Sequence, residues 1–73
     1  MTKYYVGYTQ GNGEYVYVTQ IDSTNVRVGT IIEGAMAFDN KDLAKSLVDI
    51  AKTIVANQEY VVLEITTDIK EVK

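Results

Sequence analysis

The side chains that most often carry catalysis are missing from this chain. It contains no histidine and no cysteine, which removes the usual neutral-pH general base, the thiol nucleophile and the usual zinc ligands. Ser23 and Ser46 have no candidate base that would activate their hydroxyl groups. The sequence therefore predicts that the protein is not an enzyme, and it provides no catalytic residue.

Two groups of carboxylates remain as candidates for ion chemistry. Glu64, Asp68 and Glu71 could hold a calcium ion only weakly, because their spacing is not that of a calcium-binding loop. Asp39 and Asp42 stand at the start of a helix pattern, where they would repel a phosphate group from a position at which helices often bind one. We predict no metal site and no cofactor.

Tyrosine is the residue type with the most unusual distribution. Five of the six tyrosines lie in residues 4–17, in two segments that read as the strands of a hairpin. The connection Gly11-Asn12-Gly13 joins strand to strand, which excludes a phosphate-binding loop between strand and helix. A three-residue loop with Gly13 in the left-handed conformation pairs Tyr8 with Val16. It gathers the valines on one face, together with Tyr4 and Tyr8, and leaves Tyr5, Tyr15 and Tyr17 on the other. A two-residue turn would mix valines and tyrosines on both faces.

A helix is predicted over residues 40–56, ending near Asn57. Its apolar residues recur at the spacing of one helix face, and its polar flank is mixed in charge rather than basic, which argues against a membrane-surface helix. Asp39 is the predicted N-cap. Phe38 and Leu43 occupy the positions of a hydrophobic staple.

The remaining strands complete the expected fold. Residues 26–28 and 60–66 read as strands, and residues 68–73 either prolong the last strand or fray. The last strand is expected to run parallel to the first, beside it or flanking the third, with Leu63 toward the helix. The prediction is a single domain over residues 1–73 of α+β class: β-β-β-α-β, a small mixed, mostly antiparallel sheet with one amphipathic helix covering one face.

The charge and the hydropathy limit the range of partners. The net charge is −3 and the pI about 4.7, without the basic patch that nucleic-acid binding requires. No apolar run approaches the roughly 20 residues that span a bilayer, and no signal-peptide pattern is present. We expect a cytoplasmic protein that binds neither nucleic acid nor membrane.

The sheet face away from the helix is the predicted partner-binding site. An exposed aromatic sheet face is typical of a contact surface, although tyrosines also stabilise cross-strand pairs without any partner. The residues predicted to form this face are Tyr5, Tyr15, Tyr17, Arg27, Tyr60 and Val62.

Three stretches resemble small accessory proteins of phages that infect Gram-positive bacteria. They are Tyr4-Tyr5-Val6-Gly7-Tyr8, the stretch from Ala35 to Ala44 that contains Phe38-Asp39-Asn40, and Tyr60-Val61-Val62-Leu63-Glu64-Ile65. The resemblance implies a non-catalytic phage protein that acts in the host cytoplasm, where some such proteins bind and block host defence proteins. It transfers no functional residue.

Three hypotheses for the function follow. The first is a protein-binding module, such as a phage-encoded inhibitor or modulator of a host protein, that uses the aromatic face. The second is an oligomeric protein that binds or sequesters a small ligand of nucleotide type where two such faces meet. The third is a structural homodimer without a ligand.

Overall fold

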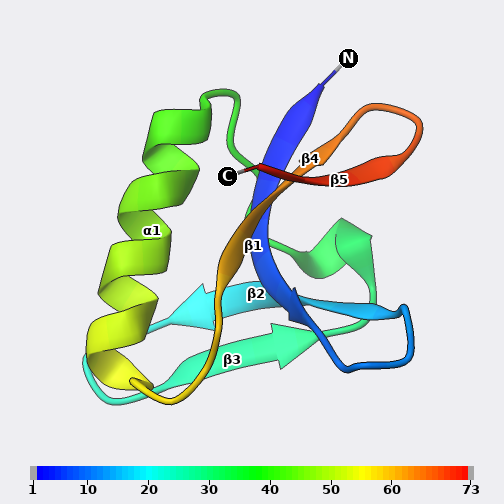
Figure 1. The fold of residues 1–73 in the computed structure, drawn as a ribbon. Coiled ribbons are helices and arrows are strands. Elements are labelled where there is room, and N and C mark those ends of the chain that lie inside the picture. Colours follow the sequence, from blue (N-terminus) through cyan, green and yellow to red (C-terminus); the bar gives the residue numbers. More distant parts are fainter. Residues whose placement is uncertain (1, 73) are drawn as a thin grey trace.

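A computed structural model describes residues 2–72 as one antiparallel sheet with one helix. The elements in chain order are β1 (Lys3–Thr9), β2 (Tyr15–Ile21), β3 (Val26–Gly29), the short 3₁₀ helix η1 (Ile32–Gly34), α1 (Lys41–Ile54), β4 (Val61–Ile65) and β5 (Ile69–Val72). The strand order is β3-β2-β1-β4-β5, and α1 lies across one face of the sheet (Figure 1). The structure thus confirms the predicted α+β fold with one amphipathic helix.

The hairpin has the predicted register. Tyr8 pairs with Val16, and the amide of Gln10 donates to the carbonyl oxygen of Glu14 at 3.0 Å, which closes a three-residue loop. Gly13 adopts a φ angle of 84°, as the loop type requires. Gly11 also adopts a left-handed φ angle, which the sequence pattern did not predict.

The direction predicted for the last strand was wrong. Strand β4 lies beside β1, which is one of the two placements predicted from the sequence. It runs antiparallel to β1, however, and Tyr5 is opposite Leu63. The reason is an additional pass of the chain along the sheet before the helix. Phe38 pairs with Tyr4 in an antiparallel bridge, so the chain has already reversed once between β3 and α1. Residues 69–72 then form a fifth strand that pairs with β4 and makes the second edge of the sheet.

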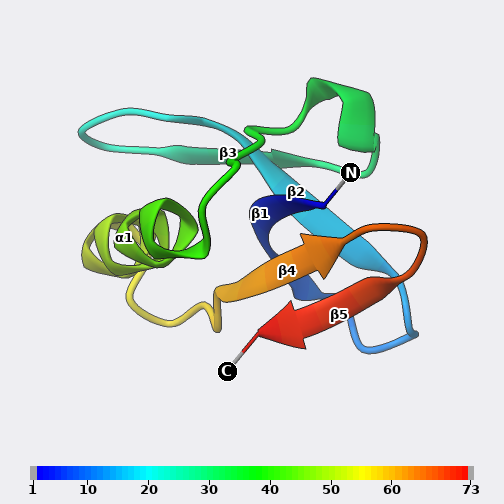
Figure 2. The same cartoon turned by 90° about the horizontal axis from the view of Figure 1, so that it is seen from above.

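Strand β1 belongs to two halves of the sheet, and Gly7 is the residue that they share. Gly7 pairs with Val61 of β4 on one side and with Tyr17 of β2 on the other. Beyond this point β1 and β2 separate, and residues 36–38 occupy the space between them: the amide of Met36 donates to the carbonyl oxygen of Val18 at 3.0 Å. The sheet therefore bends, and the β2–β3 pair and the β4–β5 pair diverge from each other on either side of β1 (Figure 2).

The close packing at the bend leaves no room for a side chain. A Cβ atom on Gly7 would lie 2.0 Å from the carbonyl oxygen of Val16 and 3.2 Å from a methyl carbon of Leu63. The carbonyl oxygen belongs to the backbone of a paired strand and cannot rotate away, so a larger residue must displace β2. Glycine at this position permits the bend of the sheet.

The helix packs its apolar stripe on the concave face beside β1 and β4. The buried residues of this helix-side core are Val6, Val18, Ala44, Leu47, Val48, Ala51, Tyr60 and Val62. Phe38 packs against the same core, whereas Leu43, its predicted staple partner, is exposed. The sequence pattern thus identified the buried helix face but not the staple.

The predicted N-cap was wrong by one residue. The side-chain oxygen of Asn40 accepts a hydrogen bond from the amide of Asp42 at 2.7 Å, so Asn40 caps the helix. Asp39 instead pairs with the ammonium group of Lys3 on β1. Both residues are good capping types, and the ion pair with β1, a tertiary contact, draws Asp39 away from the helix terminus.

We predict that Gly7→Ala destabilises the protein by about 2 kcal/mol or more, because the added methyl group must displace a paired backbone. Gly34→Ala is the matched control, since a Cβ atom there meets nothing within 4 Å. The control should change stability by less than about 1 kcal/mol. Urea denaturation measures both variants, and equal midpoints for the two would contradict the close approach at Gly7.

We predict that Asn40→Ala costs about 1 kcal/mol of folding free energy through loss of the cap. Asp39→Ala should cost less, because its side chain is largely exposed and makes a surface ion pair. Thermal unfolding at low and at high salt separates the two effects, since screening weakens the ion pair and leaves the cap. A larger loss for Asp39→Ala at high salt would assign the cap to Asp39.

Candidate binding face

The face of the sheet opposite α1 gathers four of the six predicted site residues. Tyr5 of β1 and Tyr17 of β2 lie there with ring centroids 6.2 Å apart in an edge-to-face arrangement. Tyr15 is two residues before Tyr17 on the same strand and so shares its face. Arg27 alternates with Val26, which packs against the helix-side core, and therefore lies on the tyrosine side as well.

The structure does not place Tyr60 and Val62 on this face. Both are buried in the helix-side core, and the ring of Tyr60 contacts that of Tyr8 at a centroid distance of 5.7 Å. Val6 pairs with Val62, so the antiparallel register puts Val62 on the helix side. The alternation within β4 was assigned to the wrong faces because this strand carries apolar residues on both, which leaves no contrast to orient it.

The tyrosine side has a core of its own. Tyr17 is 6 % exposed, and Leu63 of β4, expected to face the helix, is fully buried at 0 %. A methyl group of Leu63 lies against Gly7, the position at which β1 has no side chain. The backbone of β2 and the side chain of Leu63 therefore both approach Gly7 on this side, and the buried Tyr17 is part of the packing rather than an exposed contact residue.

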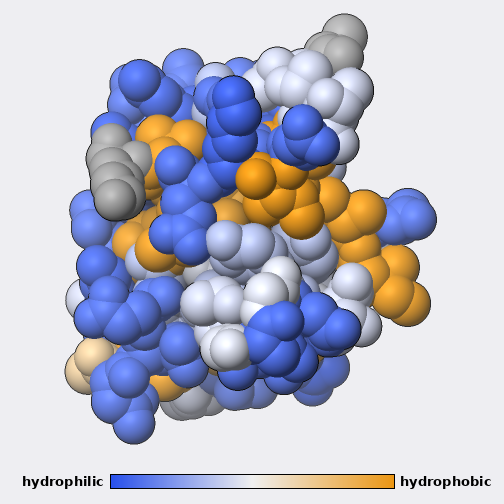
Figure 3. All heavy atoms as spheres, turned by 45° about the vertical axis from the view of Figure 1, so that its right-hand side comes forward, coloured by the Kyte–Doolittle hydropathy of each residue, from blue (hydrophilic) through white to orange (hydrophobic). Residues whose placement is uncertain are grey.

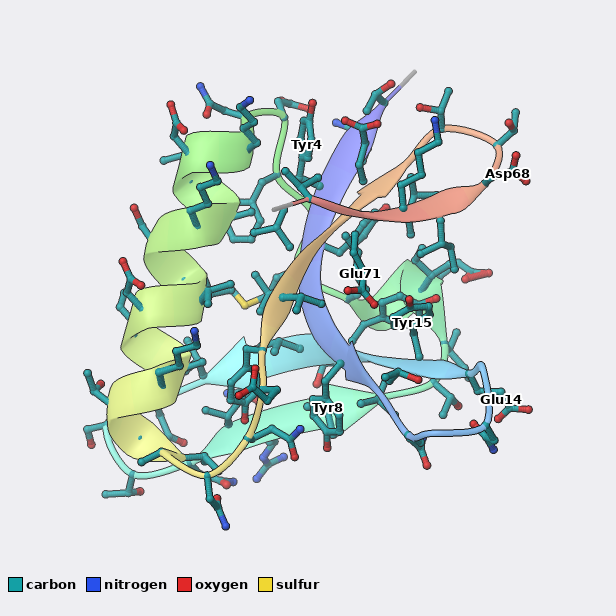
Figure 4. All side chains as sticks on the ribbon, viewed as in Figure 1. Tyr4, Tyr8, Glu14, Tyr15, Asp68 and Glu71 are labelled. Atoms are coloured by element: carbon teal, nitrogen blue, oxygen red, sulfur yellow. The ribbon has the colours of Figure 1, made fainter. Side chains whose placement is uncertain are left out.

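A hydrogen bond ties the two halves of the sheet across this face. The hydroxyl group of Tyr15 donates to Oε2 of Glu71 at 2.7 Å, although β2 and β5 are not neighbours in the sheet (Figure 4). The bond to the carboxylate raises the pKa of the Tyr15 hydroxyl, with burial as a smaller cause. This hydrogen bond fixes the position of the partly exposed Tyr15 ring.

Apolar side chains remain exposed at both borders of this face. Ile31, just before η1, is 68 % exposed, and Ile69, the first residue of β5, is 41 % exposed. The segment around η1 and the start of β5 both lie on the side away from α1 (Figure 1). Ile69 pairs with Ile65 and stands two residues before Glu71, so it shares the face of Glu71 on the tyrosine side of the sheet.

We call the half-exposed Tyr5 and Tyr15, together with Ile31 and Ile69, the open tyrosine face. With this side of the molecule turned forward, hydrophobic atoms lie exposed in the middle and at one edge of the surface, and hydrophilic residues surround them (Figure 3). The sequence prediction omitted both isoleucines. The segment around Ile31 has no hydrophobic periodicity, and the strand that contains Ile69 is too short to show one. The only signal in the sequence is that each is an apolar residue among turn-forming and charged residues.

The remaining chemistry of the described residues is sparse. Among residues 2–72 no three carboxylates gather in a position to hold a metal ion, and Asp68 and Glu71 point to different regions (Figure 4). In the same residues no helix has the length and apolar character needed to cross a bilayer.

No protein-family model, curated protein or solved structure matches this chain. In the strand order of the described residues β3 and β5 are not neighbours, so the sheet does not close on itself and both strands are edges.

We predict that the protein loses stability as the pH rises above about 10. Burial raises the pKa of the hydroxyl groups of Tyr4, Tyr17 and Tyr60 above the ordinary value of 10.0. A raised pKa in the folded state contributes stability below the unfolded pKa, and this contribution is lost as the pH passes through the folded pKa.

The urea concentration at the midpoint of unfolding should therefore stay constant from neutral pH to about pH 9 and decrease above pH 10. The Tyr17→Phe substitution should make this decrease smaller. Lys3 acts in the same direction, because its hydrogen bond to Asp39 raises the pKa of its ammonium group. Comparing the parent protein with the Tyr17→Phe variant separates the contribution of the Tyr17 hydroxyl to the pH dependence from that of Lys3. An unchanged fall in this variant would show that the Tyr17 hydroxyl is accessible to water.

Proposed function

We propose that the protein is a non-catalytic protein-binding module and that the open tyrosine face is its contact surface. The observation that carries the proposal is the exposure of Ile69, at 41 %, on the same side of the sheet as the partly exposed Tyr5 and Tyr15. Ile31, at 68 % exposure, stands just before η1, in a segment that also lies away from α1 (Figure 1). Apolar and aromatic side chains that gather on one surface are typical of protein contact sites.

The rigidity of this face supports the proposal. Tyr5 packs edge-to-face on the buried Tyr17, and the Tyr15 hydroxyl is held by Glu71. Rings that are already fixed lose little conformational entropy when a partner binds. Tyrosine also offers a hydroxyl group at the rim of an apolar contact, which suits an interface that must stay soluble without its partner.

The charge of the chain favours a protein as the partner. A net charge of −3 opposes binding to nucleic acid. Arg27 is the charged residue that shares this side of the sheet from β3, and arginine is enriched at protein contacts. The resemblance to phage accessory proteins supports a host protein as the partner, with inhibition or modulation in the host cytoplasm as the role.

Serine substitutions at the open tyrosine face test the proposal. We expect Ile31→Ser and Tyr15→Ser to abolish association with the partner while the far-UV circular dichroism spectrum and the fold are retained. Tyr17 is unsuitable for this test, because its burial makes any truncation destabilising. Leu43→Ser and Ile50→Ser are matched controls, since both residues are at least half exposed but lie on α1.

The measurements are native mass by light scattering, which detects self-association, and retention of host proteins by the immobilised chain. The proposal expects association in the parent protein, its loss in the face variants and its retention in the helix variants. A parent protein that stays monomeric and retains no host protein would contradict it. Loss of association only in the helix variants would move the contact surface to α1.

A further inference from the structure

Strand β5 is an edge of the sheet, and its outer side is free to pair. Its backbone pairs with β4 alone, and within residues 2–72 no other element lies along its outer side (Figure 2). In an antiparallel edge strand every second residue directs its backbone N–H and C=O groups away from the neighbouring strand. In the described part of the chain no further backbone hydrogen bond engages Ile69–Val72. Such an unpaired row is a template for another extended chain.

An apolar pocket opens beside this edge on the helix side of the sheet. It has a volume of about 380 Å³ and lies between α1, the start of β4 and the end of β5. Its apolar lining includes Val48, Tyr60 and Val62, which are buried in the helix-side core, and Val72, which packs against that core. A strand added beside β5 places every second side chain on the helix side of the sheet, where one apolar side chain can enter this pocket.

The flank of α1 beside the pocket is basic, although the chain as a whole is acidic. Lys45 lines the pocket, and Lys41 and Lys52 share its flank of the helix by the spacing of four and seven residues. Asp49 is the acidic residue of this flank that also lines the pocket. All four side chains are exposed, and none of them forms an ion pair within residues 2–72.

Strand β5 adds a further ammonium group on the same side. Lys70 stands two residues before Val72, so its side chain also lies on the helix side, opposite Glu64 of β4. Of the seven basic residues of the chain, four therefore stand on this flank of α1 or on β5: Lys41, Lys45, Lys52 and Lys70. With Asp49 and Glu64 counted against them, the charge around the pocket is positive, in contrast to the net charge of −3 on the whole chain.

We propose that β5 binds an extended acidic segment of a partner protein as an additional strand of the sheet. The backbone of the segment pairs with the outer side of β5, and one apolar side chain of the segment packs on Val48 and Val72 in the pocket. Acidic residues two positions before and after that side chain meet the lysines of α1 and Lys70. The inference does not rest on the proposed function, because it uses the backbone of β5 and the helix side of the sheet rather than the open tyrosine face.

The lysines favour this occupant over a second copy of the same chain. Antiparallel pairing of β5 with β5 of a second copy leaves both helices on one side of the joined sheet and turns their basic flanks toward each other. Like charges in this arrangement repel. Lys70 acts in the same direction, because a lysine on an edge strand opposes pairing with a basic strand and favours an acidic residue opposite it.

A peptide with blocked ends tests the proposal. In its sequence threonine alternates with glutamate, leucine and glutamate, so that the leucine and both glutamates share one face of the extended chain. The peptide is titrated into the intact ¹⁵N-labelled protein, and amide shifts and amide hydrogen exchange are followed by NMR. We expect saturable shifts in residues 45–49, 60–62 and 69–72, and slower exchange of alternate amides in residues 69–72, because these amides donate to the peptide.

Matched peptides separate the contributions of the side chains and the backbone. Replacing the leucine by serine should weaken binding by about tenfold or more, because the pocket loses its apolar occupant. Two further peptides carry N-methyl groups, one on the amides of the leucine and the glutamates and the other on those of the threonines. An extended chain directs these two sets of amides to opposite edges, so one methylated peptide should lose binding and the other should keep it.

Lys45→Glu should weaken binding of the acidic peptide about threefold to tenfold, since one exposed ion pair becomes a repulsion. Arg27→Glu is the matched control, because it reverses the same charge on the opposite edge strand β3, outside the pocket. It should leave the affinity unchanged.

Several outcomes would overturn the proposal. They are the absence of saturable shifts with the acidic peptide, equal binding of the serine peptide, equal behaviour of the two methylated peptides, shifts confined to the open tyrosine face, and equal effects of Arg27→Glu and Lys45→Glu. A dimeric free protein in which the alternate amides of residues 69–72 already exchange slowly would assign the edge to a second copy and would overturn it as well.

Discussion

The rest of this structure depends on glycine at position 7, because no residue with a side chain fits there. The carbonyl oxygen of Val16 lies 2.0 Å from the place where a Cβ atom would stand, and a methyl group of Leu63 lies on the same side. This close approach allows β1 to pair with β4 along its first half and with β2 along its second. A straight β1 would keep both partners in one flat sheet. The bend instead opens the space that residues 36–38 fill, and those residues bring the chain to the start of α1.

The bend also explains why the protein has apolar packing on both sides of a small sheet. The helix covers the face that carries Val6 and Val18, and on the opposite face Tyr17 and Leu63 are also buried. The tyrosines consequently divide into buried structural rings and half-exposed rings at the surface. The proposed protein contact uses the second group. Glu71 of the edge strand β5 holds Tyr15 on that side.

Local patterns in the sequence predicted the local structure well. Alternation of valine and tyrosine around Gly13 was sufficient for the hairpin register, and the helical spacing of apolar residues identified the buried face of α1. The direction and facing of β4 were not predictable, because they depend on the extra pass at Phe38 and on a strand that is apolar on both faces. The cap moved from Asp39 to Asn40 because of an ion pair with a residue 36 positions away. Of the candidate site, the tyrosines of the hairpin were identified, whereas Ile31 and Ile69 lack any periodic signal.

The environment of Leu63 tests the bent sheet most directly. In the structure the Leu63 side chain lies on the tyrosine side, with one methyl group against Gly7, whereas the facing predicted from the sequence would turn it toward α1. Nuclear Overhauser contacts of the Leu63 methyl protons distinguish the two arrangements in solution. The account predicts strong contacts to the α protons of Gly7 and none to the side chains of Leu47 and Val48. Contacts to Leu47 and Val48 without contacts to Gly7 would contradict it.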